Sequence, residues 1–233
     1  MKPHSICEDC LEKQRRIDQL LDENSQLKAL FGNQLIARIA FMHYVHGIPL
    51  GRICDQMGLD LGSVVQMLHR LAGLFKPVLP RLIERYRLAS VRHADETSWR
   101  TDGRSGYAWL FCTPDLSIFM FRQTRSASVP REVFGNLPLP GVLVVDRYNG
   151  YNQVPCKNNR SERELRPTVI ARKVSFGSQS EAGAKTREIM MSLLLTLKKR
   201  QQHAEDYFKS VLDRLAGDIK QDPLSLLFPA DSS

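Results

Sequence analysis

Val142-Leu143-Val144-Val145-Asp146 is the stretch that decides the fold, because four apolar residues in succession lead directly into a carboxylate. A strand that is apolar on both faces is typical of the centre of a sheet covered on both sides. The chain upstream has the pattern of strands with turn residues between them. Three more strands are predicted there, over residues 91–95, 107–113 and 116–123, with turns over residues 101–106 and at Pro114-Asp115.

A short helix over residues 128–134 is predicted to connect the third strand to the apolar run, which makes the fourth strand parallel to the first. Three meandering strands, a helix and a parallel fourth strand match the start of a ribonuclease H-like fold. We therefore expect a mixed sheet of the α/β (α+β) class. The first and fourth strands of that fold are neighbours, about 4.8 Å apart, so Asp95 and Asp146 are predicted to lie side by side.

A pair of carboxylates at this spacing favours a metal site. Each charge raises the pKa of the other group unless a cation lies between them. Oxygen-only ligands favour Mg²⁺ or Mn²⁺ over zinc, and a third carboxylate completes a two-metal site for in-line displacement at a phosphate. The alternative is structural: Asp95 ends a strand in solvent, and Asp146 opens a turn over residues 147–150.

Residues 157–173 carry half of the chain's net charge of +8, because six Lys and Arg outweigh two Glu. Such a local surplus favours a polyanionic partner, and a nucleic acid is the expected one. Glu162 and Glu164, in the same segment, are candidates for the third carboxylate. The candidate DNA-binding cations are Arg160, Arg163, Arg166, Arg172 and Lys173.

Residues 34–88 have a helical pattern throughout. A short helix, a turn at Gly58 and a second helix capped by Ser63 form a helix-turn-helix pattern. The exposed candidates for DNA contact on the second helix are Gln66, His69 and Arg70. A three-helix core that does not touch DNA would show the same pattern, so both interpretations stay open.

The N-terminal segment, residues 1–31, is predicted to be a short coiled-coil-like helix. Its seam contains an Asn at a position where a buried amide can fix the register of a dimer, although only about two heptads exist. The alternative is a solvated amphipathic helix. Cys7 and Cys10 have metal-ligand spacing but lack a second pair, so two exposed thiols are favoured and a zinc site is the alternative. The seam residues are Ile17, Leu20, Asn24, Leu27 and Phe31.

After Gly177 the pattern is helical again, with one apolar stripe from Ile189 to Leu197 and another from Ala204 to Leu215 that we expect in the core. Asp222-Pro223 is predicted to end the last helix before a docked tail. The predicted divisions are residues 1–31, a helix-turn-helix-like domain at 32–88, the ribonuclease H-like core at 89–200, and a C-terminal helix and tail at 201–233.

The chain has neither an apolar run near the ~18 residues of a membrane span nor the apolar region of a signal peptide. We therefore expect a cytoplasmic protein whose five cysteines are thiols.

Three motifs resemble the transposases of insertion sequence 66. His93-Ala94-Asp95-Glu96-Thr97-Ser98-Trp99-Arg100 is similar to the segment with that family's first aspartate, and Val145-Asp146-Arg147-Tyr148-Asn149-Gly150-Tyr151 to the segment with the second. Asn158-Asn159-Arg160-Ser161-Glu162-Arg163-Glu164-Leu165-Arg166-Pro167, followed by Arg172-Lys173 and Gly177-Ser178, is similar to the segment with the catalytic glutamate. The resemblance implies a DDE-type transposase with Asp95, Asp146 and Glu162 binding two Mg²⁺.

The chain departs from the family pattern at two places. Only 16 positions separate Asp146 from Glu162, where family members place a fifth strand and a long helical stretch. A cysteine-rich segment is also missing between Phe31 and Gly32. Both departures resemble internal deletions, so we expect a truncated core.

Three functions fit the sequence. The first is a transposase that binds transposon ends and target DNA and performs Mg²⁺-dependent cleavage and strand transfer. The second is a catalytically inactive, truncated relative that still binds DNA. In either case we expect a homo-oligomer or an assembly with full-length transposase. The third is a helical interaction protein with no DNA role, against which the basic segment at residues 157–173 argues.

Overall fold

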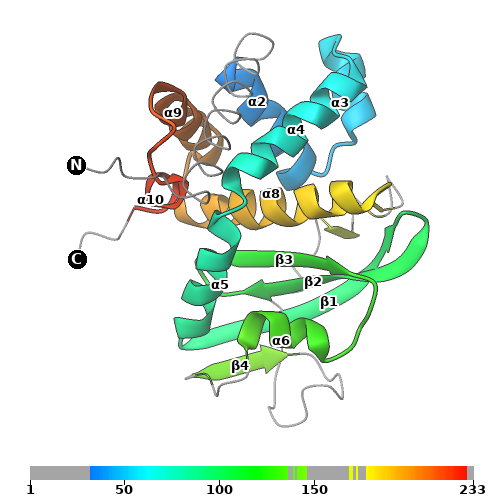
Figure 1. Ribbon diagram of the computed structural model, residues 1–233, viewed down its shortest axis with the longest axis vertical. Coiled ribbons are helices and arrows are strands. Elements are labelled where there is room, and N and C mark those ends of the chain that lie inside the picture. Colours follow the sequence, from blue (N-terminus) through cyan, green and yellow to red (C-terminus); the bar gives the residue numbers. More distant parts are fainter. Residues whose placement is uncertain are drawn as a thin grey trace, which may run out of the picture.

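The computed structural model in Figure 1 describes residues 32–135, 139, 141–145, 168–169, 172 and 177–229. The predicted N-terminal seam and the Cys7/Cys10 pair lie outside these residues. No helix in the described part of the chain has the length and apolar character needed to cross a membrane.

A four-stranded mixed sheet lies at the centre, with the order β3-β2-β1-β4. Antiparallel pairing joins β1 to β2 and β2 to β3, and β4 runs parallel to β1. The helix α6, Ser128–Phe134, connects β3 to β4 and has the predicted bounds. The predicted mixed sheet with a ribonuclease H-like start is therefore confirmed. The strands are β1 Val91–Thr101, β2 Arg104–Cys112, β3 Ser117–Arg122 and β4 Val142–Val145.

The turn between β1 and β2 is tighter than predicted. Only Asp102 and Gly103 separate the strands, and their φ angles of 53° and 71° fit a two-residue hairpin turn that needs positive φ at both positions. Both strands therefore extend further than the sequence pattern predicted. The resulting hairpin reaches beyond β3 at the right of Figure 1.

The apolar run is less covered than predicted. Val142 is 51% exposed, and only Val145 at the other end of β4 is buried. Among the described strands β4 is paired only with β1.

Within the described residues five helical segments precede the sheet, and one sequence expectation needs correction. Asp60 caps α4, because its Oδ2 accepts a hydrogen bond of 2.7 Å from the Ser63 N–H, so the helix begins before Ser63. Pro80 fits within α5 because it lies in the first turn, where a helix needs no N–H donor. The segments are α2 Asn33–Ala40, the π-helix η1 Phe41–Val45, α3 Leu50–Met57, α4 Leu61–Phe75 and α5 Val78–Leu88.

Three helices follow, α8 Glu181–Arg200, α9 Ala204–Gly217 and α10 Pro223–Leu227. The apolar stripes predicted for α8 and α9 lie in the core. Asp222 does not simply end a helix, because its side chain caps α10 through the N–H groups of Leu224 and Ser225. α9 packs on α2, and α8 packs on both α4 and β3. In Figure 1, α8 accordingly lies between the sheet and the helices α2, α3 and α4.

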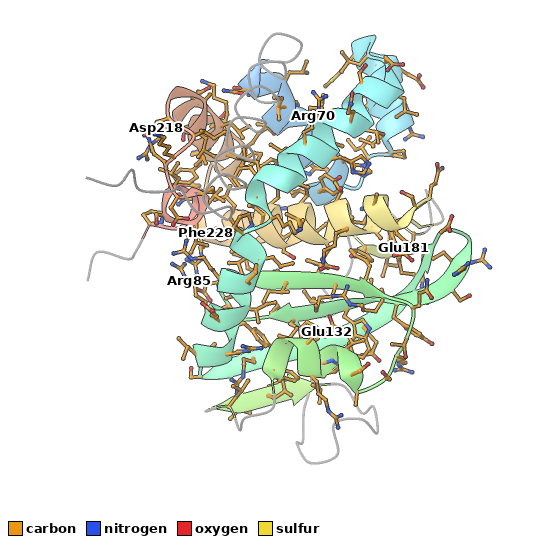
Figure 2. The ribbon with its side chains drawn as sticks, in the orientation of Figure 1. Arg70, Arg85, Glu132, Glu181, Asp218 and Phe228 are labelled. Atoms are coloured by element: carbon orange, nitrogen blue, oxygen red, sulfur yellow. The ribbon has the colours of Figure 1, made fainter. Side chains whose placement is uncertain are left out.

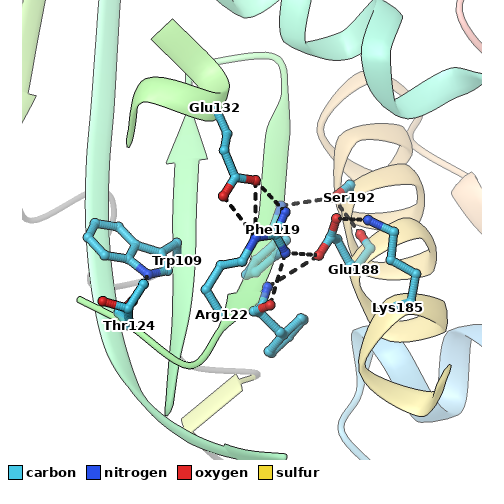
Figure 3. A network of polar contacts seen from close by, with 9 residues as sticks. Trp109, Phe119, Arg122, Thr124, Glu132, Lys185, Glu188 and Ser192 are labelled. Atoms are coloured by element: carbon cyan, nitrogen blue, oxygen red, sulfur yellow. Dashed lines mark hydrogen bonds and ion pairs between the residues drawn. The ribbon is translucent and has the colours of Figure 1, made fainter. Parts of the chain in front are cut away.

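α8 closes the outer edge of β3 with polar side chains. Glu188, Ser192 and Thr196, spaced four residues apart on one side of the helix, accept hydrogen bonds from backbone N–H groups of β3. Arg122 at the end of β3 binds Glu188 at 2.8 Å and Glu132 of α6 at 2.7 Å, as Figure 3 shows. The donors on β3 are the alternate residues Ser117, Phe119 and Phe121, at 3.0, 2.8 and 3.3 Å.

Candidate functional site

The register of β1 and β4 brings the first two acidic motifs together. Ala94 of β1 is paired with Val145, the last residue of β4. The next residue in the sequence is an aspartate in both strands, Asp95 after Ala94 and Asp146 after Val145. Asp146 lies outside the described residues, so the register up to Val145 is what the structure contributes to the predicted pair.

The Asp95 carboxylate lies at a gap in the described backbone pairing of β1, because among the residues that the structure describes β4 pairs with β1 only as far as Ala94. Its Oδ1 accepts a hydrogen bond of 2.8 Å from the N–H of Glu96. Backbone groups alternate from side to side along a strand, and those of Ser90 and Arg100 face the β4 edge, since both carbonyls accept from that side. Glu96 is in phase with them. The Asp95 oxygen therefore occupies the position of a partner strand at this edge.

Residues downstream of the glutamate motif occupy the same edge further along β1. The Ser178 N–H donates to the Arg100 carbonyl at 2.8 Å, and the Ser178 carbonyl accepts from the Asp102 N–H at 2.9 Å. The Arg172 guanidinium donates to the Ser98 carbonyl at 3.2 Å and also to the Ser98 hydroxyl. β4 thus lies along one part of this side of β1, and Arg172 and Ser178 contact another part. From Ala94 to Ser98 is only about 13 Å at ~3.3 Å per residue, and Asp95 lies in that interval.

Glu96, next to Asp95, is already committed to an ion pair. Arg125 approaches its Oε1 at 2.5 Å, and the Glu96 side chain is only 6% exposed. Successive side chains of a strand point to opposite faces, so this pair lies on the other face from Asp95. Glu96 is therefore a poor candidate for the third carboxylate, and Arg125 is a cation near the site that the sequence patterns did not indicate.

The donor chemistry at this edge suits a hard divalent cation. Asp95 offers a carboxylate, and Mg²⁺ and Mn²⁺ prefer oxygen ligands. Within the described ranges no group of three His, Cys, Asp or Glu side chains is arranged to hold a metal ion. Asp146 and Glu162, the other two predicted ligands, lie outside those ranges. The described geometry thus fits one carboxylate ligand at the gap.

The family comparison agrees with this arrangement. The model of the family described as "Transposase IS66 family" matches residues 28–156, more than half of the chain. The chain belongs to the IS66 transposase family. No curated protein matches the chain. No solved structure matches it either.

The family match includes Asp95 and Asp146 and ends at Cys156, six positions before Glu162. It therefore stops inside the interval that is shorter here than the resemblance implies. The two aspartates rest on both the family match and the sequence motif, whereas Glu162 rests on the motif alone. For this IS66-family chain, the third carboxylate remains a prediction.

The helix-turn-helix candidates lie on the far side of α8 from the sheet, where Figure 2 labels Arg70 on α4. Gln66 is exposed and Arg70 is half-buried. The prediction that His69 is exposed is wrong, because its Nδ1 lies 2.6 Å from the hydroxyl of Thr186 on α8. Packing of α4 on α8 turns this side of the helix inward.

Of the predicted DNA-binding cations in the basic segment, residues 157–173, the described part of the chain includes Arg172, which donates to Ser98 of β1. This tertiary contact was not predicted, and it gives Arg172 a structural partner besides any DNA contact. The other predicted cations, Arg160, Arg163, Arg166 and Lys173, lie outside the described residues.

A buried cation behind β1 was also missed by the sequence patterns. Arg187 of α8 is 6% exposed and lies 5.3 Å from the ring of Trp99 and 5.4 Å from that of Tyr44. It donates to Nε2 of His43 at 2.8 Å, while Nδ1 of His43 lies 2.8 Å from the Ile48 carbonyl. Burial, and secondly the charge of Arg187, lower the pKa of His43 to about 3. The cluster joins η1, α8 and β1, and Trp99 within the first acidic motif was its only sequence signal.

Proposed function

We propose that this IS66-family chain binds DNA at insertion-sequence ends and holds Mg²⁺ or Mn²⁺ through Asp95, Asp146 and Glu162. The observation that carries the proposal is the parallel register of Ala94 and Val145, the residues that Asp95 and Asp146 directly follow in the sequence. Carboxylate oxygens are ligands of the kind that Mg²⁺ and Mn²⁺ prefer. We place this activity in the cytoplasm, at the bacterial nucleoid.

The acidic residues near the end of β4 have separate proposed roles in metal binding. Asp95 would present its oxygens at the gap, and Asp146 would follow β4 to the same place. A bound Mg²⁺ supplies activation of a water or 3′-hydroxyl and stabilisation of the leaving oxygen. Glu96, held by Arg125, stays on the other face and leaves Asp95 as the ligand from β1.

DNA binding is proposed to rest on the basic segment more than on α4. The exposed cation Arg52 on α3 is accompanied by exposed Asp55 and Asp60, so the helix-turn-helix surface offers little net charge. Residues 157–173 have a surplus of four positive charges. Binding should therefore weaken steeply with salt through counterion release. For each phosphate contact, the logarithm of the binding constant should fall by about 0.9 for every tenfold rise in salt concentration.

Cleavage is proposed to be weak or absent in the 233-residue chain. The family match ends at Cys156, before Glu162, and only 16 positions separate Asp146 from Glu162 where the resemblance implies a longer interval. A misplacement of ~1 Å in a catalytic group can cost ~100-fold in rate. The observation thus also favours the second candidate function, a DNA-binding relative without activity that pairs with itself or with full-length transposase.

The experiment measures binding and cleavage of labelled element-end DNA by the same preparation, with Mg²⁺ and with EDTA. We expect salt-sensitive binding under both conditions and little cleavage, and a reduced salt slope for Arg166→Ala together with Arg163→Ala. Insertion of the family's intervening segment after Cys156 should restore cleavage. Absence of any salt-sensitive binding would contradict the DNA role, and robust Mg²⁺-dependent cleavage by the unmodified chain would contradict the proposed loss of activity.

A further inference from the structure

The hairpin of β1 and β2 ends in an arm, residues 100–105, that extends beyond β3. The pairing of β2 with β3 ends where Tyr107 meets Arg122, whereas its pairing with β1 continues as far as Thr101 and Arg104. Figure 1 shows this arm projecting past the end of β3. Thr101 is buried, and the other five residues of the arm are exposed.

The arm is held firmly where it leaves the sheet. The Trp99 side chain is 1% exposed and packs against Phe121, with ring centroids 5.1 Å apart. The Ser178 N–H donates to the Arg100 carbonyl at 2.8 Å, and the Ser178 carbonyl accepts from the Asp102 N–H at 2.9 Å. The Trp99 indole N–H also donates to the Ser178 hydroxyl, at 3.2 Å. Because its backbone is already ordered, the arm loses little conformational freedom when it binds a partner.

The arm carries one cation on each face. Arg100 is paired with Ser105, and Thr101 is paired with Arg104. Directly opposite residues share a face and successive residues alternate, so Arg100 and Arg104 lie on opposite faces of the ribbon. Within the described part of the chain, neither arginine side chain has an ion-pair or hydrogen-bond partner. Asp102 at the turn is the one acidic residue of the arm, so the two arginines leave a positive surplus.

The thickness and the charges of the arm fit the major groove of DNA. One sheet layer with its side chains is about 10 Å thick, as the spacing of stacked sheets indicates. The major groove is about 12 Å wide and admits a two-stranded ribbon. An arm that enters tip first turns its two faces toward the two phosphate strands that border the groove. Each strand then meets one guanidinium, and such phosphate contacts fix the position of a protein on the duplex.

We propose that the arm at residues 100–105 is a DNA-contacting surface, which enters the major groove and places Arg100 and Arg104 on phosphates of opposite strands. The inference rests on the proposed DNA binding and adds to it a surface apart from residues 157–173. Seven positions separate Asp95 from Asp102, or about 23 Å along the strand. That length corresponds to about seven base pairs at ~3.4 Å each. The arm therefore positions the duplex at a distance from Asp95 and takes no part in chemistry.

The salt dependence of DNA binding tests the arm against a charge-matched control. Arg100→Ala together with Arg104→Ala removes two exposed cations from the arm. Arg214→Ala together with Lys220→Ala removes two exposed cations next to Asp218, on the opposite side of the molecule in Figure 2. Affinity for labelled element-end DNA is measured in EDTA at several salt concentrations. We expect the arm variant to lose about 1.8 from the slope of the logarithm of the binding constant against that of salt, at ~0.9 per phosphate contact, and the control variant to keep the parent's slope.

Cross-linking shows whether the arm itself meets DNA. In a chain with Cys7, Cys10 and Cys156 replaced by serine, Ser105→Cys places a thiol on the arm, and Ser210→Cys places one at an exposed position of α9. The probe is the same DNA with a disulfide-activated tether on single bases in the major groove. We expect Ser105→Cys to cross-link at a short run of neighbouring positions and Ser210→Cys at none. Because all substituted side chains are exposed, melting temperatures should match that of the parent.

The outcomes separate this inference from the proposed function. Salt-sensitive binding with the parent's slope in the arm variant, an equal loss of slope in the arm and control variants, or no cross-link from Ser105→Cys would overturn the role of the arm. Each of these outcomes leaves DNA binding through residues 157–173 in place. A parent that shows no salt-sensitive binding would contradict the proposed function, and the role of the arm with it.

Discussion

The outer edge of β3 and the β4-facing side of β1 satisfy their backbone groups in different ways. At the β3 edge, buried side chains of α8 accept the N–H groups, and Glu188 is 1% exposed and paired with both Arg122 and Lys185. On the β4-facing side of β1, Asp95 accepts the N–H of its own neighbour and is only half-buried. A buried acceptor between two cations stabilises the fold. A half-buried carboxylate is partly accessible to solvent, so the difference separates a structural acid from a candidate functional one.

The largest expected effect comes from breaking the closed edge at Glu188. Glu188→Ala removes a buried partner of Arg122 and leaves the Phe121 N–H unpaired, so we expect unfolding to cost about 3–5 kcal/mol less than in the parent. Urea denaturation followed by circular dichroism measures the change. Asp213→Ala, at an exposed ion pair with Lys209, is the control and should change stability by less than about 0.5 kcal/mol. Equal effects at the two sites would show that the closed edge is not a structural centre.

The next prediction concerns the pH dependence of stability that arises from His43, which contacts Arg187 of α8. The pKa of His43 is about 3 in the folded chain, against 6.5 for the unfolded chain. As pH falls below 6.5, the unfolded chain binds the proton first, so stability is complete above that pH and declines toward the folded pKa. Between pH 7.5 and 5.0 we expect a loss of about 2 kcal/mol from this group, at ~1.4 kcal/mol per pH unit.

Urea denaturation at the two pH values, compared between the parent and His43→Gln, isolates this contribution. Arg187 is the charged group that faces His43 from α8, and it keeps its charge over this range. The loss should be smaller by about 2 kcal/mol in His43→Gln, and unchanged in the control His203→Gln at an exposed position. If His43→Gln loses as much stability as the parent, the imidazole is not held neutral by this packing.

A smaller effect is expected at Ser192. Ser192→Ala leaves the Phe119 N–H without its acceptor, which should cost about 1–3 kcal/mol because a buried donor is left unpaired. The exposed Ser210→Ala, which also removes one hydroxyl from a helix, should be nearly neutral. Hydrogen exchange at the Phe119 amide is a second measurement. Ser192→Ala should accelerate that exchange, whereas Ser210→Ala should leave it unchanged.

The comparison also shows what sequence patterns can reveal. The strands, the bounds of α6 and the apolar stripes of α8 and α9 were predictable because they depend on local periodicity. The roles of Glu188, Ser192 and Thr196 were not, because their spacing on α8 is equally that of a solvated stripe until β3 is placed beside it.

At the candidate site, the pairing of the strand ends that lead to Asp95 and Asp146 followed from the fold pattern. The contact of Arg172 with Ser98, the inward side of His69 and the exposure of Val142 in β4 did not, because each depends on which elements pack together. Gly177 belonged to a recognised motif, but its reason became visible only with the Arg100 carbonyl beside it.

Asp95→Asn tests the central claim most directly, because it separates the contribution of Asp95 to the fold of β1 from its proposed function as a metal ligand. Asparagine keeps an oxygen that can accept the Glu96 N–H, so the metal-free melting temperature should change little. The measurement is the rise in melting temperature with millimolar Mn²⁺, which stabilises the folded chain by mass action if only the folded chain binds it. We predict a clear rise for the parent and none for Asp95→Asn. An equal rise in both proteins, or no rise in the parent, would contradict the account.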